Sequence, residues 1–374
     1  MRVLLDATAV PEDRGGVGRY VDELAPELVA AGVDLVVVVQ QRDEAHYRAL
    51  LPGAEVITAP RSASRRPLRM LWEQTGLPAL VRKVGADVLH SPHYTLPFFA
   101  GVPVVVTLHD ATFFTEPEVH LRSKAVFFRA AIRLAARRAR CLVAPSEATR
   151  DEVVRLVGAD PARFVVAHHG VDHDMFHPTS VQEQARVRAT LDIPSDEYVG
   201  FLGTLEPRKN VPALIRAWVA ACADREDPPA LVLAGGRGWD SEIDLTMADV
   251  PSHLTVRRTG YLPLEDLPGF LGGAVVLAYP SLGEGFGLPV LEAMACRTAV
   301  LTTRELSLPE VGGDAVAYCG TDEISIAREL ERLLDDPVRR EGLAEAARLR
   351  AETFTWARAA ASHRQAYEQA LGVS

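Results

Sequence analysis

The chain has 374 residues and a formal net charge of −10, and 48% of its residues are apolar while 24% are charged. This length exceeds what one hydrophobic core usually supports, so we expect two domains. No segment approaches the ~20 consecutive apolar residues that span a bilayer. The acidic balance argues against general binding of nucleic acid.

The N-terminus and the cysteines indicate a cytoplasmic protein. Residues 1–6 hold only a short apolar run before an aspartate, which predicts a first strand rather than a signal peptide. The cysteines at positions 141, 222, 296 and 319 are widely spaced and form no C-x-x-C pair. We therefore expect reduced thiols rather than disulfides or a metal site.

Short apolar runs alternate with helical patterns in the first half of the chain. This alternation is typical of a parallel α/β sheet that is covered on both faces. Pro26 lies inside the first helical pattern and should kink or shorten that helix. The expected strands are residues 3–5, 35–39, 88–90, 104–108 and 141–144, and the expected helices include residues 17–31 and 124–139.

The same pattern restarts after a polar segment at residues 170–178, with expected strands at 199–202, 230–233, 254–257, 275–278 and 299–301. We therefore predict two Rossmann-like α/β domains, residues 1–175 and 176–355, that face each other across a cleft. A final helix over residues 356–371 is a candidate to pack back onto the first domain. Ligands of such sheets bind beyond the carboxyl ends of the strands.

The segment at residues 15–18, Gly-Gly-Val-Gly, follows the first strand and opens a helix. Glycines let the backbone approach a ligand closely, and free amides at a helix start favour an anion. The alternative is a tight turn without a ligand. A dinucleotide site is disfavoured, because Val21 stands where a third glycine is required and Gln40-Gln41 supply no acid for a ribose.

His109 and Asp110 end a predicted strand of the first domain. A histidine at a strand end is well placed for a bound sugar, although a lone histidine is often only structural. Asp110 could fix the ring tautomer of His109 or bond a substrate hydroxyl.

Arg208 and Lys209 follow the first strand of the second domain, within Gly-Thr-Leu-Glu-Pro-Arg-Lys-Asn at residues 203–210. Asn210 and Pro212 mark the start of a helix. Adjacent cations at that position would clamp a pyrophosphate. The alternative is a solvated basic pair.

Two carboxylates, Glu284 and Glu292, stand eight residues apart within residues 281–295. A glycine-bracketed turn and the first turn of a helix are expected between a buried strand and Glu292. This strand–loop–helix pattern predicts a site for a sugar nucleotide, with pyrophosphate on the backbone amides and hydroxyls on the acids. Glu292 alone could be an ordinary acid at a helix start, where the helix dipole favours negative charge.

Together these motifs resemble the family 4 retaining glycosyltransferases of GT-B fold. The order and spacing match over nearly the whole chain, and the combination is specific although no single motif is. The matching residues are Gly15-Gly16, His109-Asp110, Gly170-Val171-Asp172, Arg208-Lys209, the Glu284/Glu292 pair, residues 302–315 and Phe354-Thr355-Trp356.

The resemblance implies roles for individual residues. Arg208 and Lys209 would bind the donor diphosphate, with help from Gly15 and Gly16. Glu292 would hold the ribose hydroxyls. Many relatives have a further arginine where Thr204 stands, so one charge fewer would hold the leaving diphosphate.

The same resemblance assigns the sugar and base positions. Glu284 and the amides of Phe286, Gly287 and Leu288 would hold the donor sugar, and His109 would contact it near the reacting centre. Tyr261 or Leu262 would lie near the nucleobase. The predicted catalytic residues are Glu284, His109 and Asp110. Family members need no metal or other cofactor, and the sequence offers no cluster that requires one.

The expected reaction retains the anomeric configuration and passes through an oxocarbenium-like state, with cations stabilising the departing charge. Glu284 could be a nucleophile or only orient the sugar. The sequences of residues 205–210 and of Trp72-Glu73-Gln74 are most similar to the bacterial mannosyltransferase branch of the family. This similarity favours GDP-mannose as the donor over UDP-glucose, UDP-N-acetylglucosamine or dTDP-sugars.

The first domain should set the acceptor, which we expect to be a glycan, a lipid-linked glycan or a secondary metabolite. The basic segment from Arg122 to Arg140 contains apolar residues at helical spacing. Such a helix can lie on an anionic membrane surface, or its apolar side can pack on the sheet while the arginines meet water.

Three other classes compete with this interpretation. A sugar-nucleotide epimerase of the same fold would release a changed sugar nucleotide without an acceptor. A dehydrogenase is disfavoured by the missing glycine and ribose acid. A silent binding module is disfavoured by the intact set of Glu284, His109, Arg208 and Lys209.

Overall fold

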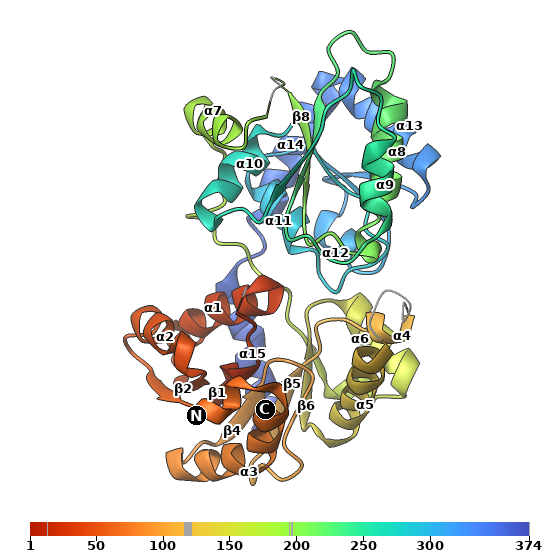
Figure 1. Cartoon of the computed structure of the whole chain (residues 1–374). Coiled ribbons are helices and arrows are strands. Elements are labelled where there is room, and N and C mark those ends of the chain that lie inside the picture. Colours follow the sequence, from red (N-terminus) through yellow and green to blue (C-terminus); the bar gives the residue numbers. More distant parts are fainter. Residues whose placement is uncertain (13, 116–121, 194, 196, 374) are drawn as a thin grey trace. The chain divides into compact units, whose positions relative to one another are not determined.

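The computed structural model of the chain divides into two compact units (Figure 1). Unit 1 comprises Met1–Gly170 and Thr355–Ser374, and unit 2 comprises Val171–Phe354. The structure describes every residue except 13, 116–121, 194, 196 and 374. The chain passes from one unit to the other inside the polar segment at residues 170–178 and returns just before the last helix.

Unit 1 is built on a seven-stranded sheet in which all neighbouring strands are parallel. Residues of the central strand β1 such as Leu4, which pairs with Val36 and Leu89, are fully buried because helices cover both faces. In spatial order the strands are β3 (Glu55–Thr58), β2 (Asp34–Val39), β1 (Arg2–Asp6), β4 (Val88–Ser91), β5 (Val104–Thr107), β6 (Cys141–Ala144) and β7 (Phe164–Val166).

The helices of unit 1 lie on both faces of this sheet. Buried side chains of α3 and α5 pack in one core with Leu4, Leu89 and Val106. The intervening residues His90 and Thr107 point to the opposite face, where α1 and α15 pack against each other. The helices are α1 (Gly15–Ala30), α2 (Glu44–Leu50), α3 (Arg66–Val84), α4 (Thr112–Thr115), α5 (Arg122–Arg138), α6 (Glu147–Val157) and α15 (Trp356–Leu371).

Unit 2 repeats the design with a six-stranded parallel sheet. The order is β10 (Val256–Gly260), β9 (Ala230–Ala234), β8 (Tyr198–Leu202), β11 (Val276–Tyr279), β12 (Val300–Thr303) and β13 (Ala317–Cys319). Helix α8 packs with α9 and α13, while α10 packs with α7 and α11 (Figure 1). The helices are α7 (Val181–Thr190), α8 (Val211–Cys222), α9 (Glu242–Ala248), α10 (Leu267–Gly273), α11 (Leu288–Ala295), α12 (Leu308–Gly312), α13 (Glu323–Asp335) and α14 (Pro337–Ala351).

Pro26 does not shorten the first helix, which was one of the two effects expected from the sequence. Helix α1 runs on to Ala30 with Pro26 inside it. The residues on both sides of the proline, Leu24, Ala25 and Leu28, are fully buried. Their burial offsets the hydrogen bond that the proline cannot donate, because tertiary packing supplies most of the stability of a helix in a folded protein.

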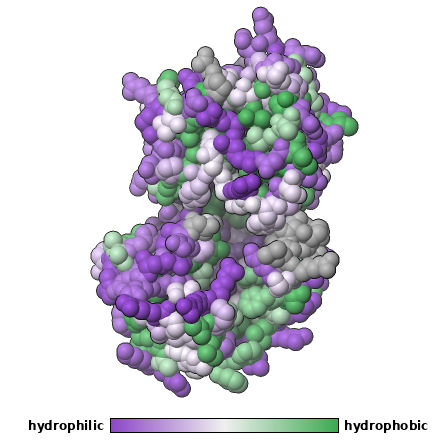
Figure 2. Space-filling model, viewed as in Figure 1, coloured by the Kyte–Doolittle hydropathy of each residue, from purple (hydrophilic) through white to green (hydrophobic). Residues whose placement is uncertain are grey.

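The surface is largely polar. On the face seen in Figure 2, apolar residues form small groups between hydrophilic ones. Within the described part of the chain, no helix combines the length and the apolar character needed to cross a bilayer. The four cysteines are free and buried.

Candidate functional site

The loops that follow β8 and β11 form a charged cluster in unit 2. These strands are neighbours in the sheet although they are far apart in the sequence, so their carboxyl ends meet at one edge. The first loop enters a short helical turn, Pro207–Lys209, and the second contains Glu284. The amide of Leu282 donates to the carbonyl of Arg208 at 2.9 Å, which joins the two loops directly.

Glu284 is the centre of this cluster. Its Oε1 accepts from Lys209 Nζ at 2.6 Å, from the Tyr279 hydroxyl at 2.9 Å and from the Ser281 hydroxyl at 2.6 Å. Its Oε2 pairs with Arg208 Nη1 at 2.6 Å. Both oxygens are therefore engaged, and the carboxylate is only 7% exposed.

The charges of the cluster are strongly coupled. Burial alone would raise the pKa of Glu284, but Arg208 and Lys209 outweigh it and hold that pKa at about 2. Burial and Arg208 lower the pKa of Lys209, against the opposing effect of Glu284. Burial and Glu284 raise the pKa of Tyr279 well above its usual value, so its hydroxyl stays a donor. Glu284 is thus a stable anion with weak basicity.

A further acid completes the charge balance. Glu206 Oε1 accepts from Arg208 Nη2 at 2.7 Å. The two cations at positions 208 and 209 are therefore matched by two carboxylates in direct contact. The structure brings the predicted residues Arg208, Lys209 and Glu284 together.

Side chains of the segment at residues 302–315 hydrogen-bond to the backbone of the loop that contains Glu284. Ser307 Oγ lies 2.8 Å from the carbonyl oxygen of Glu284 and 2.9 Å from that of Phe286, and Thr303 Oγ1 donates to the carbonyl of Ser281 at 2.7 Å. Gly287 has a φ of 101°, and a Cβ there would lie 3.0 Å from Leu308. The loop geometry therefore requires glycine at this position.

Glu292 does not lie in the first turn of its helix, where the sequence placed it. Helix α11 begins at Leu288 and has no acid in its first turn, so Glu292 lies one turn further on. It is fully buried, as its neighbours in α11 are. The helix dipole therefore does not explain its presence.

The remaining predicted donor residues differ in exposure. Phe286 and Leu262 are 4% and 5% exposed, whereas Tyr261 is 69% exposed and Thr204 is also exposed.

Glycines that were not predicted from the sequence allow the chain segments at the ends of β8, β9 and β10 to approach one another closely. Gly235 donates to the carbonyl of Gly260 at 2.8 Å, and a Cβ on Gly235 would lie 2.0 Å from the Gly203 oxygen. The Gly-Gly-Arg-Gly run after β9 was a readable signal for this close approach.

His109 lies at the carboxyl end of β5 in unit 1 and is partly exposed. Its Nε2 contacts the carbonyl oxygen of Pro92 at 2.7 Å. A carbonyl can only accept, so Nε2 carries the proton and Nδ1 is left as the acceptor. Burial lowers the pKa of His109, partly offset by the Pro92 bond and Asp110, and keeps the ring neutral.

The expected tautomer-fixing role of Asp110 is not observed. Its Oδ1 accepts from the amide of Thr112 at 3.2 Å and from the Thr112 hydroxyl at 2.9 Å, at the start of α4. Short polar side chains commonly take this local bond. The main-chain oxygen of Pro92 fixes the His109 ring instead, and sequence patterns do not reveal main-chain partners.

Behind His109, a network of neutral rings joins β4, β5 and α1 to the last helix, α15. The Tyr20 hydroxyl lies 2.9 Å from Thr107 Oγ1 and 2.6 Å from His363 Nε2. His90 lies 2.9 Å from both Thr107 Oγ1 and the Tyr367 hydroxyl. Burial lowers the pKa of His363 to about 4 and also lowers the pKa of His90 well below its usual value. The network was missed in the sequence because its members are scattered.

The glycine turn at the start of α1 is held by Arg14, which has a φ of 53° and pairs with Asp22 and Asp43. A Cβ on Gly18 would lie 2.7 Å from Arg14 Cβ, so Gly18 is needed for packing. A Cβ on Gly16 would meet nothing within 4 Å. Packing therefore does not explain Gly16, while an approaching ligand would. Gly15 opens the helix beside it.

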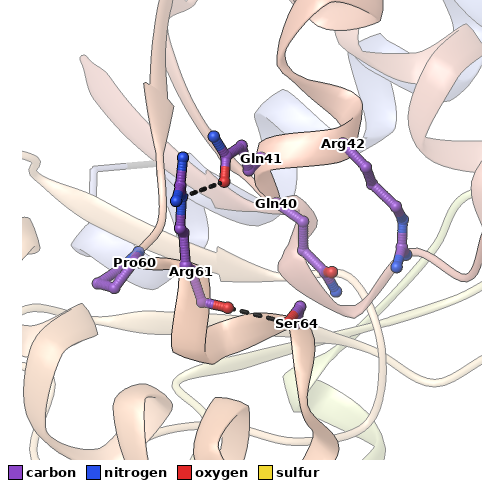
Figure 3. A pocket seen from close by; sticks show the side chains of 6 residues that line it. All are labelled: Gln40, Gln41, Arg42, Pro60, Arg61 and Ser64. Carbon is purple, nitrogen blue, oxygen red and sulfur yellow. Dashed lines mark hydrogen bonds between the residues drawn. The ribbon is translucent and has the colours of Figure 1, made fainter.

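Unit 1 also holds an open pocket of about 460 Å³ beyond β2 and β3, and most of the residues that line it are polar. Figure 3 shows its lining residues, among which Arg61 donates to Gln41 Oε1 at 3.0 Å. Arg42 Nη2 donates to the carbonyl of Val10, and Gln40 Nε2 donates to that of Thr8. The pocket is thereby linked to the segment that leads into the glycine turn. Its lining residues are Gln40, Gln41, Arg42, Pro60, Arg61 and Ser64.

Comparison with known proteins identifies both halves of the chain. Residues 14–175 match the model Glycosyltransferase Family 4, and residues 183–350 match Glycosyl transferases group 1. The chain is 31% identical to O-antigen chain mannosyltransferase B of Escherichia coli, over 72% of this chain and 71% of that protein. It is 30% identical to the D-inositol 3-phosphate glycosyltransferase of Kineococcus radiotolerans, over 96% and 91%.

Solved structures share the fold at lower identity. The Anabaena protein HepE, solved with UDP and glucose, has a TM-score of 0.76 at 19% identity, with 98% of each chain covered. The sucrose-phosphate synthase of Thermosynechococcus elongatus has a TM-score of 0.79 at 21% identity, with both chains fully covered. The chain therefore belongs to the family 4 glycosyltransferases: it is an enzyme that transfers sugar, and it has the GT-B fold of two Rossmann-like domains.

Proposed function

We propose that the enzyme transfers a hexose, mannose from GDP-mannose, with retention of configuration to a hydroxylated acceptor. The observation that carries the proposal is the contact of Glu284 with both Arg208 and Lys209 at the carboxyl ends of β8 and β11. Fixed cations at such strand ends suit a departing diphosphate. The mannosyltransferase relative supports the choice of sugar.

In this proposal unit 2 binds the donor. Arg208 and Lys209 neutralise the diphosphate, and the amides of Phe286, Gly287 and Leu288 hold the sugar with Glu284. Glu292 holds the ribose, and Tyr261, Leu262 and Thr204 lie toward the base and phosphates. His109 and Asp110 of unit 1 contact the reacting sugar, and Gly15 and Gly16 contact the diphosphate.

We further propose that Glu284 orients the sugar and is not the nucleophile. Its oxygens already accept from Lys209, Tyr279 and Ser281 and pair with Arg208. A carboxylate with a pKa near 2 is a weak base and therefore a poor nucleophile. The acceptor would then attack from the face that the diphosphate leaves.

The donor is tested by thermal stabilisation, because a ligand that binds the native state raises the melting temperature by mass action. GDP-mannose is expected to give the largest shift among GDP-mannose, UDP-glucose, UDP-N-acetylglucosamine and a dTDP-sugar. A structural neighbour solved with UDP and glucose favours the second candidate, another donor with the same chemistry. A larger shift with UDP-glucose would establish that candidate.

The alternative class, a sugar-nucleotide epimerase, is separated by product analysis. The donor is incubated alone and the nucleotide sugars are resolved by chromatography. A transferase leaves the donor unchanged or releases nucleoside diphosphate. Formation of an isomeric sugar nucleotide would overturn the proposed transfer.

The acceptor, a glycan or lipid-linked glycan, is assigned to unit 1. The pocket beyond β2 and β3 presents Arg42 and Arg61, and Arg65 and Arg66 are exposed nearby in the sequence. These cations favour an acceptor that carries a phosphate or another anion. Arg61→Gln should raise the KM for such an acceptor while the KM for the donor stays unchanged; equal effects on both would remove the pocket from acceptor binding.

A peripheral contact of α5 with an anionic membrane also stays a proposal. Ala135 and Ile132 pack in the core, so the apolar side of this helix is largely used by the fold. Val126 and Phe127 remain 66% and 41% exposed beside the exposed Lys124. Flotation with liposomes that contain anionic lipid, and absence of flotation with neutral liposomes, is the expected result; no flotation with either would favour a soluble acceptor.

A further inference from the structure

The α3 residues Glu73 and Gln74 hold the loop between β4 and β5. Glu73 is 2% exposed, and its Oε2 accepts from Thr95 Oγ1 at 2.7 Å and from Arg69 Nη1 at 3.3 Å. Its Oε1 accepts from Gln74 Nε2 at 3.1 Å. Both oxygens of this buried carboxylate are therefore engaged.

Gln74 forms hydrogen bonds with two further residues of the same loop. Its Nε2 donates to the carbonyl of Leu96 at 3.2 Å, and its Oε1 accepts from the amide of Phe98 at 2.8 Å. With the bond from Glu73 to Thr95, two adjacent side chains of one helix hold three positions of the loop. These contacts fix the loop against α3.

The other end of the loop holds His109 and Asp110. The carbonyl of Pro92 accepts from His109 Nε2 at 2.7 Å, and the amide of Asp110 donates to the Tyr94 hydroxyl at 3.1 Å. Tyr94 adopts a φ of 56°, and its amide donates to the carbonyl of Thr107 at 3.2 Å. A non-glycine residue rarely takes this backbone conformation unless its surroundings enforce it.

A carboxylate at position 73 is costly for folding. Burial and the neighbouring Asp6 both disfavour its charge, and Thr95 and Arg69 only partly compensate. Replacement of a whole buried ion pair, such as Glu73 with Arg69, by uncharged side chains of similar shape is often neutral or stabilising. Stability alone therefore does not account for Glu73.

We propose that Glu73, together with Gln74, is a positioning residue: through the loop at residues 92–98 it sets the orientation and the Nε2-protonated tautomer of His109, so that Nδ1 accepts a hydroxyl of the reacting sugar. This inference rests on the proposed function, because it gives His109 a substrate. Glutamine at position 73 keeps the volume but turns an NH₂ group either toward Arg69 Nη1 and Thr95 Oγ1 or toward Gln74 Nε2, and the nitrogens of Arg69 and Gln74 can only donate. The loop, and His109 with it, then shifts.

The test compares Glu73→Gln and Thr95→Val with a matched control, Glu329→Gln. Glu329 is a buried carboxylate of α13 in unit 2, 8% exposed and paired with Arg332 and Arg339. Glu73→Gln is expected to lower kcat ~10- to 100-fold, the scale of a small misplacement of a reacting group. The KM for the donor stays within about two-fold of the unchanged protein, since the donor is assigned to unit 2.

Two further readouts separate positioning from loss of structure. The ¹⁵N signals of the His109 imidazole should change from the Nε2–H pattern in Glu73→Gln and Thr95→Val, and stay unchanged in Glu329→Gln. The kcat of the double variant of Glu73 and Thr95 should be no lower than that of the slower single variant. The reason is that each single substitution already breaks the same hydrogen bond, the one between Glu73 and Thr95. A kcat within two-fold of the parent, or a lower kcat with unchanged His109 signals, would overturn the inference.

Failure of the proposed function gives a different pattern. In that case the parent enzyme turns over no nucleotide sugar, while the NMR change at His109 is still expected in Glu73→Gln. If Glu73 positions nothing, the parent is active, and Glu73→Gln is equally active with parental imidazole signals.

Discussion

The two parallel sheets carry very different polar groups at their carboxyl ends. In unit 2, Glu206, Arg208, Lys209 and Glu284 place four formal charges in direct contact. In unit 1, the ends of β4 and β5 carry neutral histidines and hydroxyl groups of tyrosine and threonine instead. The same architecture therefore supports a cluster of contacting charges in one unit and a network of directional hydrogen bonds between neutral groups in the other.

The difference matches the roles that we propose for the two sites. A departing diphosphate requires positive charge that is already fixed in place, since preorganised charges need no reorganisation when the bond breaks. Carboxylates at positions 206 and 284 keep Arg208 and Lys209 in position and lower the cost of burying them. Sugar hydroxyls are uncharged, and a neutral ring such as that of His109, with a fixed tautomer, suits them.

Substitution of Glu284 should give the largest effect. Glu284→Gln removes the charge and turns an NH₂ group toward Arg208 or the Oε1 donors, so kcat should fall ~100-fold or more. Affinity for nucleoside diphosphate should stay the same or increase, because Arg208 and Lys209 lose a competing anion. Donor turnover and calorimetric titration with GDP measure the two quantities.

Glu323→Gln is the matched control for this change, because Glu323 forms an exposed pair with Arg216 in the same unit. It should leave both quantities unchanged, as exposed pairs contribute little. Parental turnover of Glu284→Gln would remove Glu284 from the reaction, and the charged site would then serve stability only.

Acid should weaken unit 1 before unit 2. His363 has a folded pKa of about 4, below its usual 6.5. Its contribution to the free energy of unfolding is therefore present above pH ~6.5 and is lost as the pH falls toward 4. One pKa unit corresponds to about 1.4 kcal/mol, so His363 alone contributes on the order of 3 kcal/mol. His90 acts in the same direction, and the raised pKa values of Asp6 and Glu73 offset part of the loss.

Glu284 behaves differently over this range. Its pKa is about 2, below the usual 4.5. Its contribution to the free energy of unfolding is therefore complete down to pH ~4.5 and is lost only as the pH falls toward 2. Hydrogen-exchange protection, corrected for intrinsic rates, should therefore fall in α15 between pH 7 and pH 5 while α8 keeps its protection. Equal loss in both helices would show that the histidine network does not set the acid sensitivity of unit 1.

Removal of one hydroxyl from the neutral network should give the smallest effect. Tyr20→Phe leaves His363 Nε2 and Thr107 Oγ1 without their shared partner, which should lower the free energy of unfolding of unit 1 by about 1–3 kcal/mol. Chemical denaturation followed by exchange protection in α15 measures this change. Unchanged protection in α15 would mean that packing alone docks the last helix, without help from the network.

The sequence predicted the inner strands and the edge strand β10, and it missed the other three edge strands. The strands β3, β7 and β13 were not expected, and all three are at sheet edges. An edge strand pairs on one side only and is often short or partly exposed. The strands β7 and β13 have only three residues each, which makes their apolar runs hard to distinguish from loops. For β3, only Val56 of its four residues is buried.

The site was predictable where its groups come from motifs at strand ends. Arg208, Lys209 and Glu284 were expected together, and they are in contact because β8 and β11 are neighbours in the sheet. The partners of His109 were not predictable. A main-chain carbonyl from another loop fixes its tautomer, and the buried carboxylate Glu73 holds that loop from a helix.

The two α/β halves, the family resemblance and the charged residues at the strand ends are readable from the chain alone, because apolar periodicity, glycine placement and adjacent cations are local properties. The folded structure is needed to show which of these charges are neutralised in contact, which tautomer His109 adopts and why Tyr20 and His363 are buried together. Those properties depend on distances between segments far apart in the chain, and the free energies of burial and hydrogen bonding that set them exist only once the sheets and helices have packed.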